Sequence, residues 1–270
     1  MITKRMLGRL AIAMATAGLM SAAAAETTIA YITNGNTNEG WTLINGGAKK
    51  AGQKAGVKFI ELAAEKGELS KQLAIVEDMI TRKVNAIAIA PVDSAGIAPA
   101  INKALAAGIK VVAVDTGISG AKITSYVATD NIKAAMVQGD WTADQVKDGD
   151  TVIYITGDLG QSTGQERKKG FLDGLNAKRK NVKVVEVSTT WDQTMAQNGV
   201  ETAMRANPGV KVIACAWDGG ALGAKAALMA AGKKAGDVKI AGFDGSPGGL
   251  DMMKQGWQQA NAAQMLAKIG

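Results

Sequence analysis

The chain has 270 residues, 47% of them hydrophobic and 20% charged, and this balance predicts a globular protein of one large domain or two ordinary ones. It contains no histidine and a single cysteine, Cys215. This excludes His-based catalytic triads, His- or thiolate-ligated metal sites, iron–sulfur clusters and intramolecular disulfides. Most hydrolytic and metal-dependent chemistry is thereby disfavoured, and we expect no metal and no cofactor.

The first 25 residues are typical of a cleaved signal peptide. Lys4, Arg5 and Arg9 precede the apolar stretch Leu10–Met20, and small alanines follow it, which places the mature N-terminus at Glu26. A membrane anchor is the alternative, but the apolar stretch is short of the ~20 residues that a span needs. Cleavage would lower the net charge from +7 to +4, so the basicity of the whole chain is weak evidence for a nucleic-acid partner.

From Thr28 onward, short apolar runs alternate with amphipathic segments. In chain order the first half predicts strand Thr28–Thr33, helix Trp41–Ala55, strand Val57–Glu61, helix Leu69–Arg82, strand Ala86–Ala90, helix Ser94–Ala107, strand Val111–Val114 and a short segment at Ser125–Ala128. The run AIAIA at 86–90 is apolar throughout, which is typical of a parallel strand covered on both faces.

After 125–128 the same pattern starts again. It predicts helix Ala134–Val146, strand Thr151–Thr156, helix Thr163–Lys178, strand Val182–Val187, helix Met195–Arg205, strand Val212–Ala216, helix Ala221–Ala231, strand Val238–Phe243 and helix Leu250–Gln255. Two such blocks predict an α/β fold of two similar doubly wound parallel-sheet lobes. The boundary near Thr129–Asn131 has no linker composition, so we expect a packed crossover there.

Ligands of doubly wound sheets lie beyond the carboxyl ends of the strands, so the residues that follow each strand are candidates for a site. They are rich in Asn, Asp and Trp: Asn34–Asn38, Pro91–Asp93, Asp115 and Thr116, Gly157–Gly164, Trp191 and Asp192, Trp217 and Asp218, and Asp244. Indole rings cover the apolar faces of sugars, and charged groups bind the hydroxyls. This combination indicates a carbohydrate site.

The same residues also fit purely structural roles that involve no ligand. Asp93 and Asp218 are equally good candidates for helix N-caps. Trp217 is a candidate for core packing, and Arg167 for a solvated helix charge. Cys215 lies in an apolar run, where a buried, inert thiol is expected.

Several segments, in order and almost without gaps, resemble the periplasmic sugar-binding proteins of the ribose/galactose type, partners of ABC importers. The resemblance runs from Thr28 to Gly270. It is carried by IAPVDS at 89–94, VD at 114–115, VATDN at 127–131, ERKKGF at 166–171, ALGA at 221–224 and GFDG at 242–245.

The resemblance implies a type I periplasmic binding fold with a hinge, and a protein that binds a ligand rather than an enzyme. The first lobe would comprise 26–128, the second 129–258, and 259–270 would return to the first lobe. The ligand would be a monosaccharide or polyol bound between the lobes of a monomer. A permease in the inner membrane would receive it, with a chemoreceptor as the alternative or additional partner, and the protein would be periplasmic.

The resemblance also implies roles for individual residues. Trp41 and Trp191 would cover opposite faces of the sugar, while Asp115 and Asp244, one from each lobe, would bind its hydroxyls. Further ligand contacts are implied at Asn38, Arg167 and Gln264.

Three departures from ribose binders bear on the ligand. Gly40 stands where a second aromatic residue is usual, Thr116 replaces an arginine, and Trp217 stands where an asparagine is common. We include Thr116 and Trp217 among the ligand-contacting residues. The changes favour a hexose, a deoxy sugar or an alditol over ribose.

The family pattern continues for several tens of residues after the position of Gly270. By resemblance, that segment would hold another helix, a third crossover and a final strand of the first lobe. The sequence is therefore expected to be truncated at its C-terminus relative to the family.

Two other functional classes are alternatives for this fold. The loop Gly157–Gly164 follows a strand and precedes a helix, like a dinucleotide-binding loop, but its spacing is not G-x-G-x-x-G and no Tyr-x-x-x-Lys pair occurs in the chain. Both observations argue against the alternative of a dinucleotide-dependent oxidoreductase. Repressors with this effector fold carry an N-terminal helix-turn-helix, where this chain has its leader.

Overall fold

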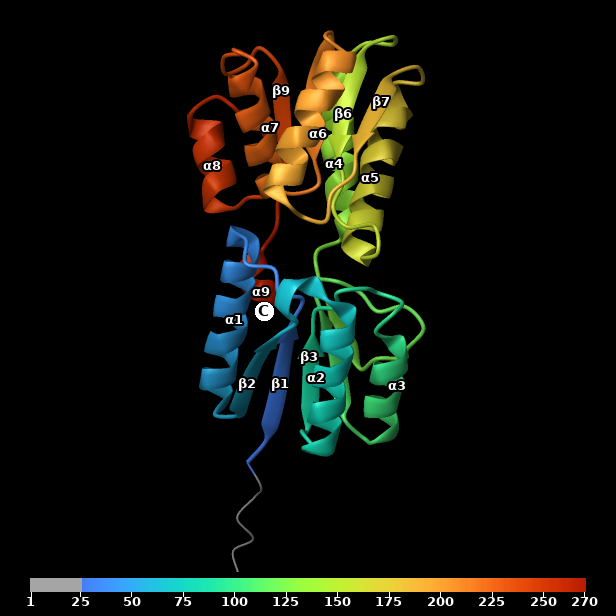
Figure 1. Ribbon diagram of the computed structural model, residues 1–270, viewed down its shortest axis with the longest axis vertical. Coiled ribbons are helices and arrows are strands. Elements are labelled where there is room, and N and C mark those ends of the chain that lie inside the picture. The colour runs from blue at the N-terminus through green and yellow to red at the C-terminus, as the bar shows by residue number, and fades with distance from the viewer. Residues whose placement is uncertain (1–25) are drawn as a thin grey trace, which may run out of the picture.

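A computed structural model describes residues 26–270, so the expected signal peptide at 1–25 lies outside the described residues. The described chain forms two parallel five-stranded sheets, with strand orders β2-β1-β3-β4-β5 and β10-β9-β8-β6-β7. Figure 1 shows two α/β lobes stacked along the long axis, each with helices flanking its sheet. The α/β fold class predicted from the alternation is thereby confirmed.

The first lobe is built from the N-terminal half of the chain. Its strands are β1 (Thr28–Thr33), β2 (Lys58–Ala63), β3 (Ala86–Ile89), β4 (Lys110–Val114) and β5 (Ser125–Val127). Its helices are α1 (Glu39–Ala55), the short η1 (Glu65–Gly67), α2 (Leu69–Thr81) and α3 (Ala98–Ala106).

The second lobe follows the same plan. Its strands are β6 (Thr151–Ile155), β7 (Lys183–Val187), β8 (Val210–Cys215), β9 (Lys239–Asp244) and β10 (Ala260–Ala263). Its helices are α4 (Asn131–Gln145), α5 (Ser162–Lys178), α6 (Gln193–Ala206), α7 (Asp218–Ala230) and α8 (Pro247–Lys254). A last short helix, α9 (Leu266–Ile269), packs against α1 of the first lobe.

Both faces of the first sheet are covered, because successive side chains of a strand point to opposite faces. Ala30 and Ile32 of β1 belong to the core under α2 and α3, whereas Tyr31 between them belongs to a smaller core with Ile44 of α1 and Leu266 of α9. The second lobe has a larger core of its own, in which Cys215 is fully buried, as expected.

Most predicted boundaries differ from the structure by no more than three residues, and two expectations were wrong by more. Residues 260–263 form β10, which pairs with β9 in the second sheet, so the chain returns to the first lobe only after Ala263 and not at 259. The segment ANAA lacks the branched and aromatic residues that mark a strand in sequence. Helix α3 begins at Ala98 rather than Ser94, because the Asp93 carboxylate accepts the backbone N–H groups of Ala95 and Gly96 and holds a turn there.

The helices described between residues 26 and 270 include none that is both long and apolar enough to cross a membrane. Within the same residues, no three Asp, Glu, Cys or His side chains gather in a way that could hold a metal ion.

Candidate ligand-binding site

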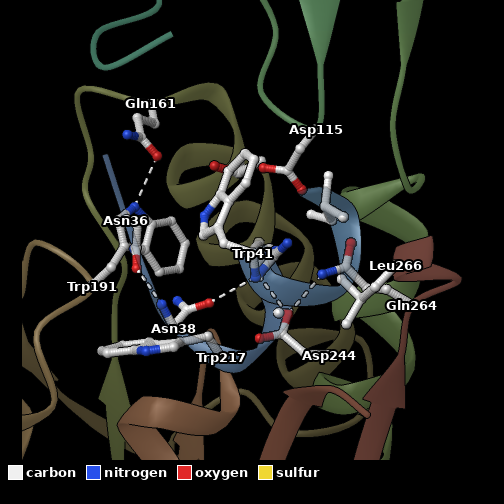
Figure 2. A pocket seen from close by; sticks show the side chains of 14 residues that line it. Asn36, Asn38, Trp41, Asp115, Gln161, Trp191, Trp217, Asp244, Gln264 and Leu266 are labelled. Carbon is white, nitrogen blue, oxygen red and sulfur yellow. Dashed lines mark hydrogen bonds and ion pairs between the residues drawn. The ribbon is translucent and has the colours of Figure 1, made fainter. Parts of the chain in front are cut away.

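A pocket lies where the carboxyl ends of the strands of both lobes face each other (Figure 2). The enclosed cavity has a volume of about 30 Å³, and the space rises to about 370 Å³ when the open mouth is included. It is lined by Asn36, Asn38, Gly40, Trp41, Ile44, Asp115, Gln161, Thr163, Arg167, Trp191, Trp217, Asp244, Gln264 and Leu266.

Eight of the nine residues expected to contact a ligand line this pocket, and Thr116 does not. The Thr116 side chain is fully buried and donates a hydrogen bond from Oγ1 to Oδ2 of Asp115, at 2.9 Å. It therefore stands behind Asp115 and orients that carboxylate. Sequence order could not show this, because adjacent residues at the end of a strand point in different directions.

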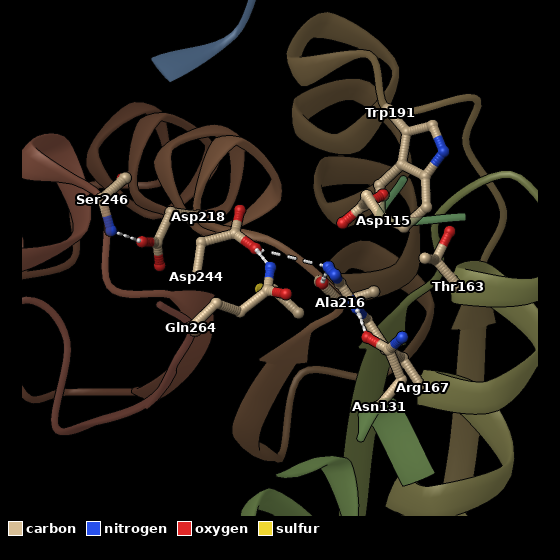
Figure 3. A network of polar contacts seen from close by, with 12 residues as sticks. Asp115, Asn131, Thr163, Arg167, Trp191, Ala216, Asp218, Asp244, Ser246 and Gln264 are labelled. Carbon is tan, nitrogen blue, oxygen red and sulfur yellow. Dashed lines mark hydrogen bonds and ion pairs between the residues drawn. The ribbon is translucent and has the colours of Figure 1, made fainter. Parts of the chain in front are cut away.

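The polar floor of the pocket is organised by Arg167 of α5 (Figure 3). Its Nε donates to Oδ1 of Asn131 at 2.8 Å, and its Nη1 donates to the Ala216 carbonyl at 2.8 Å and to Oδ1 of Asp244 at 3.3 Å. The guanidinium also lies over the rings of Phe243 and Trp191. With 4% of Arg167 exposed, a solvated helix charge is excluded.

The two pocket carboxylates come from different lobes and are both nearly buried. Asp115 follows β4 and Asp244 ends β9, and they are 8% and 7% exposed. Burial raises the pKa of Asp115, and the nearby Arg167 charge opposes that rise. Burial raises the pKa of Asp244 to about 7 against the same opposing charge, and Asp218 adds to the rise. Gln264 donates to Oδ1 of Asp244 at 2.7 Å.

Three indoles supply the apolar walls. Trp41 is the third residue of helix α1, and Oδ1 of the N-cap residue Asn38 accepts its backbone N–H at 3.0 Å. Trp191 and Trp217 meet edge to face, with ring centroids 5.4 Å apart. Trp217 is 2% exposed and belongs to the core of the second lobe, so it is both a core residue and a pocket residue.

Backbone strain concentrates at this pocket. Among the described residues, five non-glycine residues have positive φ, and three of them are the pocket residues Asp115 (61°), Trp191 (61°) and Asp244 (111°). Such conformations cost about 1–3 kcal/mol each and persist where the surrounding structure holds them. Each follows or ends a strand and turns its side chain into the pocket.

The predicted ligand contacts left out several lining residues. Asn36, Gln161 and Thr163 fall within the candidate segments that follow β1 and β6, Asn34–Asn38 and Gly157–Gly164, but were not singled out there. Ile44 and Leu266 carried no such signal. They are helix residues on α1 and α9 and look like ordinary core positions in sequence.

Neither Asp93 nor Asp218 is the N-cap residue of its neighbouring helix, α3 or α7. Asp93 holds the turn before α3 described above. The Asp218 carboxylate accepts the Ser246 backbone N–H at 2.8 Å and Asn261 Nδ2 at 2.6 Å, so it ties α7 to the start of α8 and to β10. These bonds use Asp218 for the architecture of the second lobe rather than for the cap of α7.

The loop Gly157–Gly164 joins the two lobes. Gly160 and Ser162 bond to Ser94, and Ser162 Oγ accepts the Gly117 backbone N–H at 2.8 Å. The loop therefore contacts the first lobe with the backbone and hydroxyl groups that the dinucleotide alternative would use for phosphate.

A family model described as a periplasmic binding protein domain matches residues 29–270. The chain belongs to the periplasmic binding protein family. It is 32% identical over 265 residues to the ribose import binding protein of Salmonella typhimurium, with 98% of this chain and 88% of that protein covered. It is 35% identical over 264 residues to the D-ribose/D-allose-binding protein of Pseudomonas aeruginosa, covering 92% and 82% of the two chains.

The solved structures agree with this membership. The myo-inositol binding protein of Caulobacter, solved with bound myo-inositol, superposes with a TM-score of 0.85 at 28% identity, covering 90% of this chain and 83% of that one. This periplasmic binding protein thus has transport proteins as relatives, and it is not an enzyme. The oxidoreductase and repressor alternatives are set aside.

Proposed function

We propose that this chain is the substrate-binding protein of an ABC importer and binds a monosaccharide or a related polyol between its two lobes. The observation that carries the proposal is the pair of buried carboxylates, Asp115 and Asp244, which come from different lobes and meet in a pocket walled by indoles. Two carboxylates and an arginine accept and donate hydrogen bonds to hydroxyls, and indoles pack on C–H faces.

The ligand is proposed to differ from ribose in outline. The relatives of this chain include proteins named for ribose, for ribose and allose, and for myo-inositol. Gly40 adds no side chain to the pocket, whereas Trp217 adds a bicyclic ring to it. These features favour a hexose, a deoxy sugar or a cyclic or linear polyol.

Binding is proposed to proceed by closure of the lobes around the ligand. Each lobe supplies one carboxylate and at least one indole, so a ligand gains its full set of contacts only when both lobes reach it. The ligand then shifts the open–closed equilibrium by its difference in affinity for the two forms.

The remaining assignments follow from the same reading. The family model describes a periplasmic binding domain and relatives are named import binding proteins, which supports a periplasmic location and a membrane permease as partner. The proposal includes export by cleavage before Glu26, a monomeric state, and a chemoreceptor as an alternative or additional partner.

Calorimetric titration of residues 26–270 against pentoses, hexoses, deoxy sugars and polyols tests the function. We expect one-to-one binding of one or a few of these compounds, after circular dichroism has shown that the chain is folded. Amino acids and nicotinamide dinucleotides serve as control ligands. A folded chain that binds none of the sugars and polyols would contradict the proposal.

A further inference from the structure

Gln161 connects the first lobe to an indole of the pocket. Its Nε2 donates to the Val92 carbonyl of the first lobe at 3.1 Å, and its Oε1 accepts the indole N–H of Trp191 at 2.8 Å (Figure 2). Gln161 is buried, with 5% of the residue exposed. One amide therefore bridges the backbone of one lobe and the pocket wall of the other.

The bridge lies at the centre of a wider set of bonds between the lobes. On one side of Gln161, the Ser94 backbone N–H donates to the Gly160 carbonyl at 3.1 Å. On the other side, the Ser162 backbone N–H donates to Ser94 Oγ at 2.9 Å, and Ser162 Oγ accepts from Gly117. Separation of the lobes would break these bonds together with the bond from Gln161 to Val92.

The Trp191 indole is held on several sides within this arrangement. A Cβ on Gly157 would lie 2.0 Å from the six-membered ring, so the indole rests directly on the Gly157 backbone. The edge of the ring system meets Trp217, and the Arg167 guanidinium lies 5.5 Å from the ring centroid. Since the Trp191 backbone has positive φ, the hydrogen bond to Gln161 helps to hold a conformation that the backbone alone disfavours.

We propose that Gln161 is a positioning residue that couples closure of the lobes to the placement of the Trp191 indole in the pocket. When the lobes are together, the Val92 carbonyl fixes the amide with its oxygen toward Trp191. When they part, the amide loses that anchor and the indole N–H loses a fixed acceptor. The wall of the pocket is then complete only in the closed arrangement.

The inference rests on the proposed function in taking this pocket as the ligand site, so its test is made without a ligand. The probe is the rate at which the Trp191 indole N–H exchanges with solvent in the apo chain, followed by NMR. Trp191→Phe assigns the signal by removing it.

We expect Gln161→Leu to accelerate this exchange about five- to tenfold, as expected for the loss of one hydrogen bond. Gln165→Leu is the matched control, because Gln165 lies in the first turn of α5, directly after Gln161, is exposed and donates to the Leu159 carbonyl of the same lobe. It should leave the Trp191 signal unchanged.

The coupling between closure of the lobes and the position of the indole is tested by a variant in which Gln161 and Trp191 are both unchanged. Ser94→Ala with Ser162→Ala removes hydroxyl bonds between the lobes, and small-angle scattering reports how far the lobes open. We expect the Trp191 N–H to exchange faster in this variant, whereas Ser119→Ala, at an exposed serine nearby, should change neither quantity.

Two results would overturn the inference. One is unchanged Trp191 exchange in folded Gln161→Leu, and the other is unchanged exchange in a serine variant whose lobes have opened. Because no sugar is present, these results are independent of whether the chain binds sugars, which the calorimetric titration decides separately.

Discussion

Arg167 and Asp244 form an ion pair at the floor of the pocket, with Nη1 3.3 Å from Oδ1 and both side chains nearly out of contact with water. The guanidinium is anchored further by Asn131 and the Ala216 carbonyl. The carboxylate is thus presented to the pocket by a cation that is itself fixed by the core of the second lobe.

Replacing Arg167 should destabilise the protein strongly. In Arg167→Met the Asp244 carboxylate stays buried without its cation, and loss of one partner of a buried pair typically costs about 3–5 kcal/mol. The free energy of unfolding from urea titration measures this. Arg167→Met with Asp244→Asn should be less destabilised than Arg167→Met alone, because the uncompensated charge is gone. If the single and the double variant lost the same free energy of unfolding, the charges of Arg167 and Asp244 would not be energetically coupled.

Removing either pocket carboxylate should weaken ligand binding. Asp244→Asn also removes the partner of Arg167, so circular dichroism must show that this variant is folded before it is titrated. Asp115→Asn and Asp244→Asn each lose a charged acceptor for sugar hydroxyls, and such contacts contribute about 1.5–3 kcal/mol, or roughly 10- to 150-fold in Kd. Calorimetry with the ligand of the unmodified chain is the measurement. Asp93→Asn is the control, because its oxygen can still hold the turn before α3 and lies outside the pocket lining. Unchanged affinity in both pocket variants would contradict the site.

Ligand affinity should depend on pH through Asp244. Its pKa is raised to about 7 in the ligand-free protein, so the acid is increasingly protonated as the pH falls below 7. Hydroxyls that donate to the carboxylate favour the ionised form, so binding should release a proton. Affinity should accordingly fall below pH 7, at most about tenfold per pH unit for one group.

Calorimetry in buffers of different ionisation enthalpy counts the protons released. At pH 6 we expect release in the unmodified chain and clearly less in Asp244→Asn. Proton uptake on binding would show that the ligand prefers the neutral acid and would contradict this assignment.

Gly157→Ala should impair binding by displacing the Trp191 indole. The added methyl group would lie 2.0–2.3 Å from three atoms of the ring, so the indole must move. We expect a loss of affinity or a changed order of preferred sugars. Gly46→Ala on α1, where no atom lies within 4 Å of the new Cβ, is the control and should bind normally. An equal effect of both substitutions would rule out the steric explanation.

Trp217→Phe should change both ligand preference and stability. The indole packs in the core of the second lobe and lines the pocket, so a smaller ring leaves space on both sides. A stability loss of about 1–3 kcal/mol is expected, together with a new ranking of sugars. Trp141→Phe, which packs against the same core outside the pocket lining, should reduce stability and leave the ranking unchanged. An unchanged ranking in Trp217→Phe would make Trp217 a core residue alone.

The alternation of short apolar runs and amphipathic segments was sufficient to predict the α/β class and most of the elements. Strand β1 spans the residues predicted for it, and helix α5 differs from its prediction by one residue at its start. These elements are determined locally, because burial on both faces of a parallel sheet leaves a near-continuous apolar run in the sequence. Strand β10 was missed because its four small residues owe their strand conformation to pairing with β9.

The candidate site, too, was predicted from the sequence only in part. The sequence predicted that Asp115 would lie at the carboxyl edge of the first sheet, and Trp191 and Asp244 at that of the second, because the carboxyl ends of parallel strands share an edge. That these two edges would face each other was implied by the family resemblance. The hydrogen bond from Thr116 to Asp115 and the bridge from Val92 through Gln161 to Trp191 were decided by the tertiary structure alone. Periodicity in the sequence determines which face of an element a residue takes. These contacts depend instead on side-chain rotamers and on the approach of the two lobes, which brings Gln161 to Val92, 69 positions earlier in the chain.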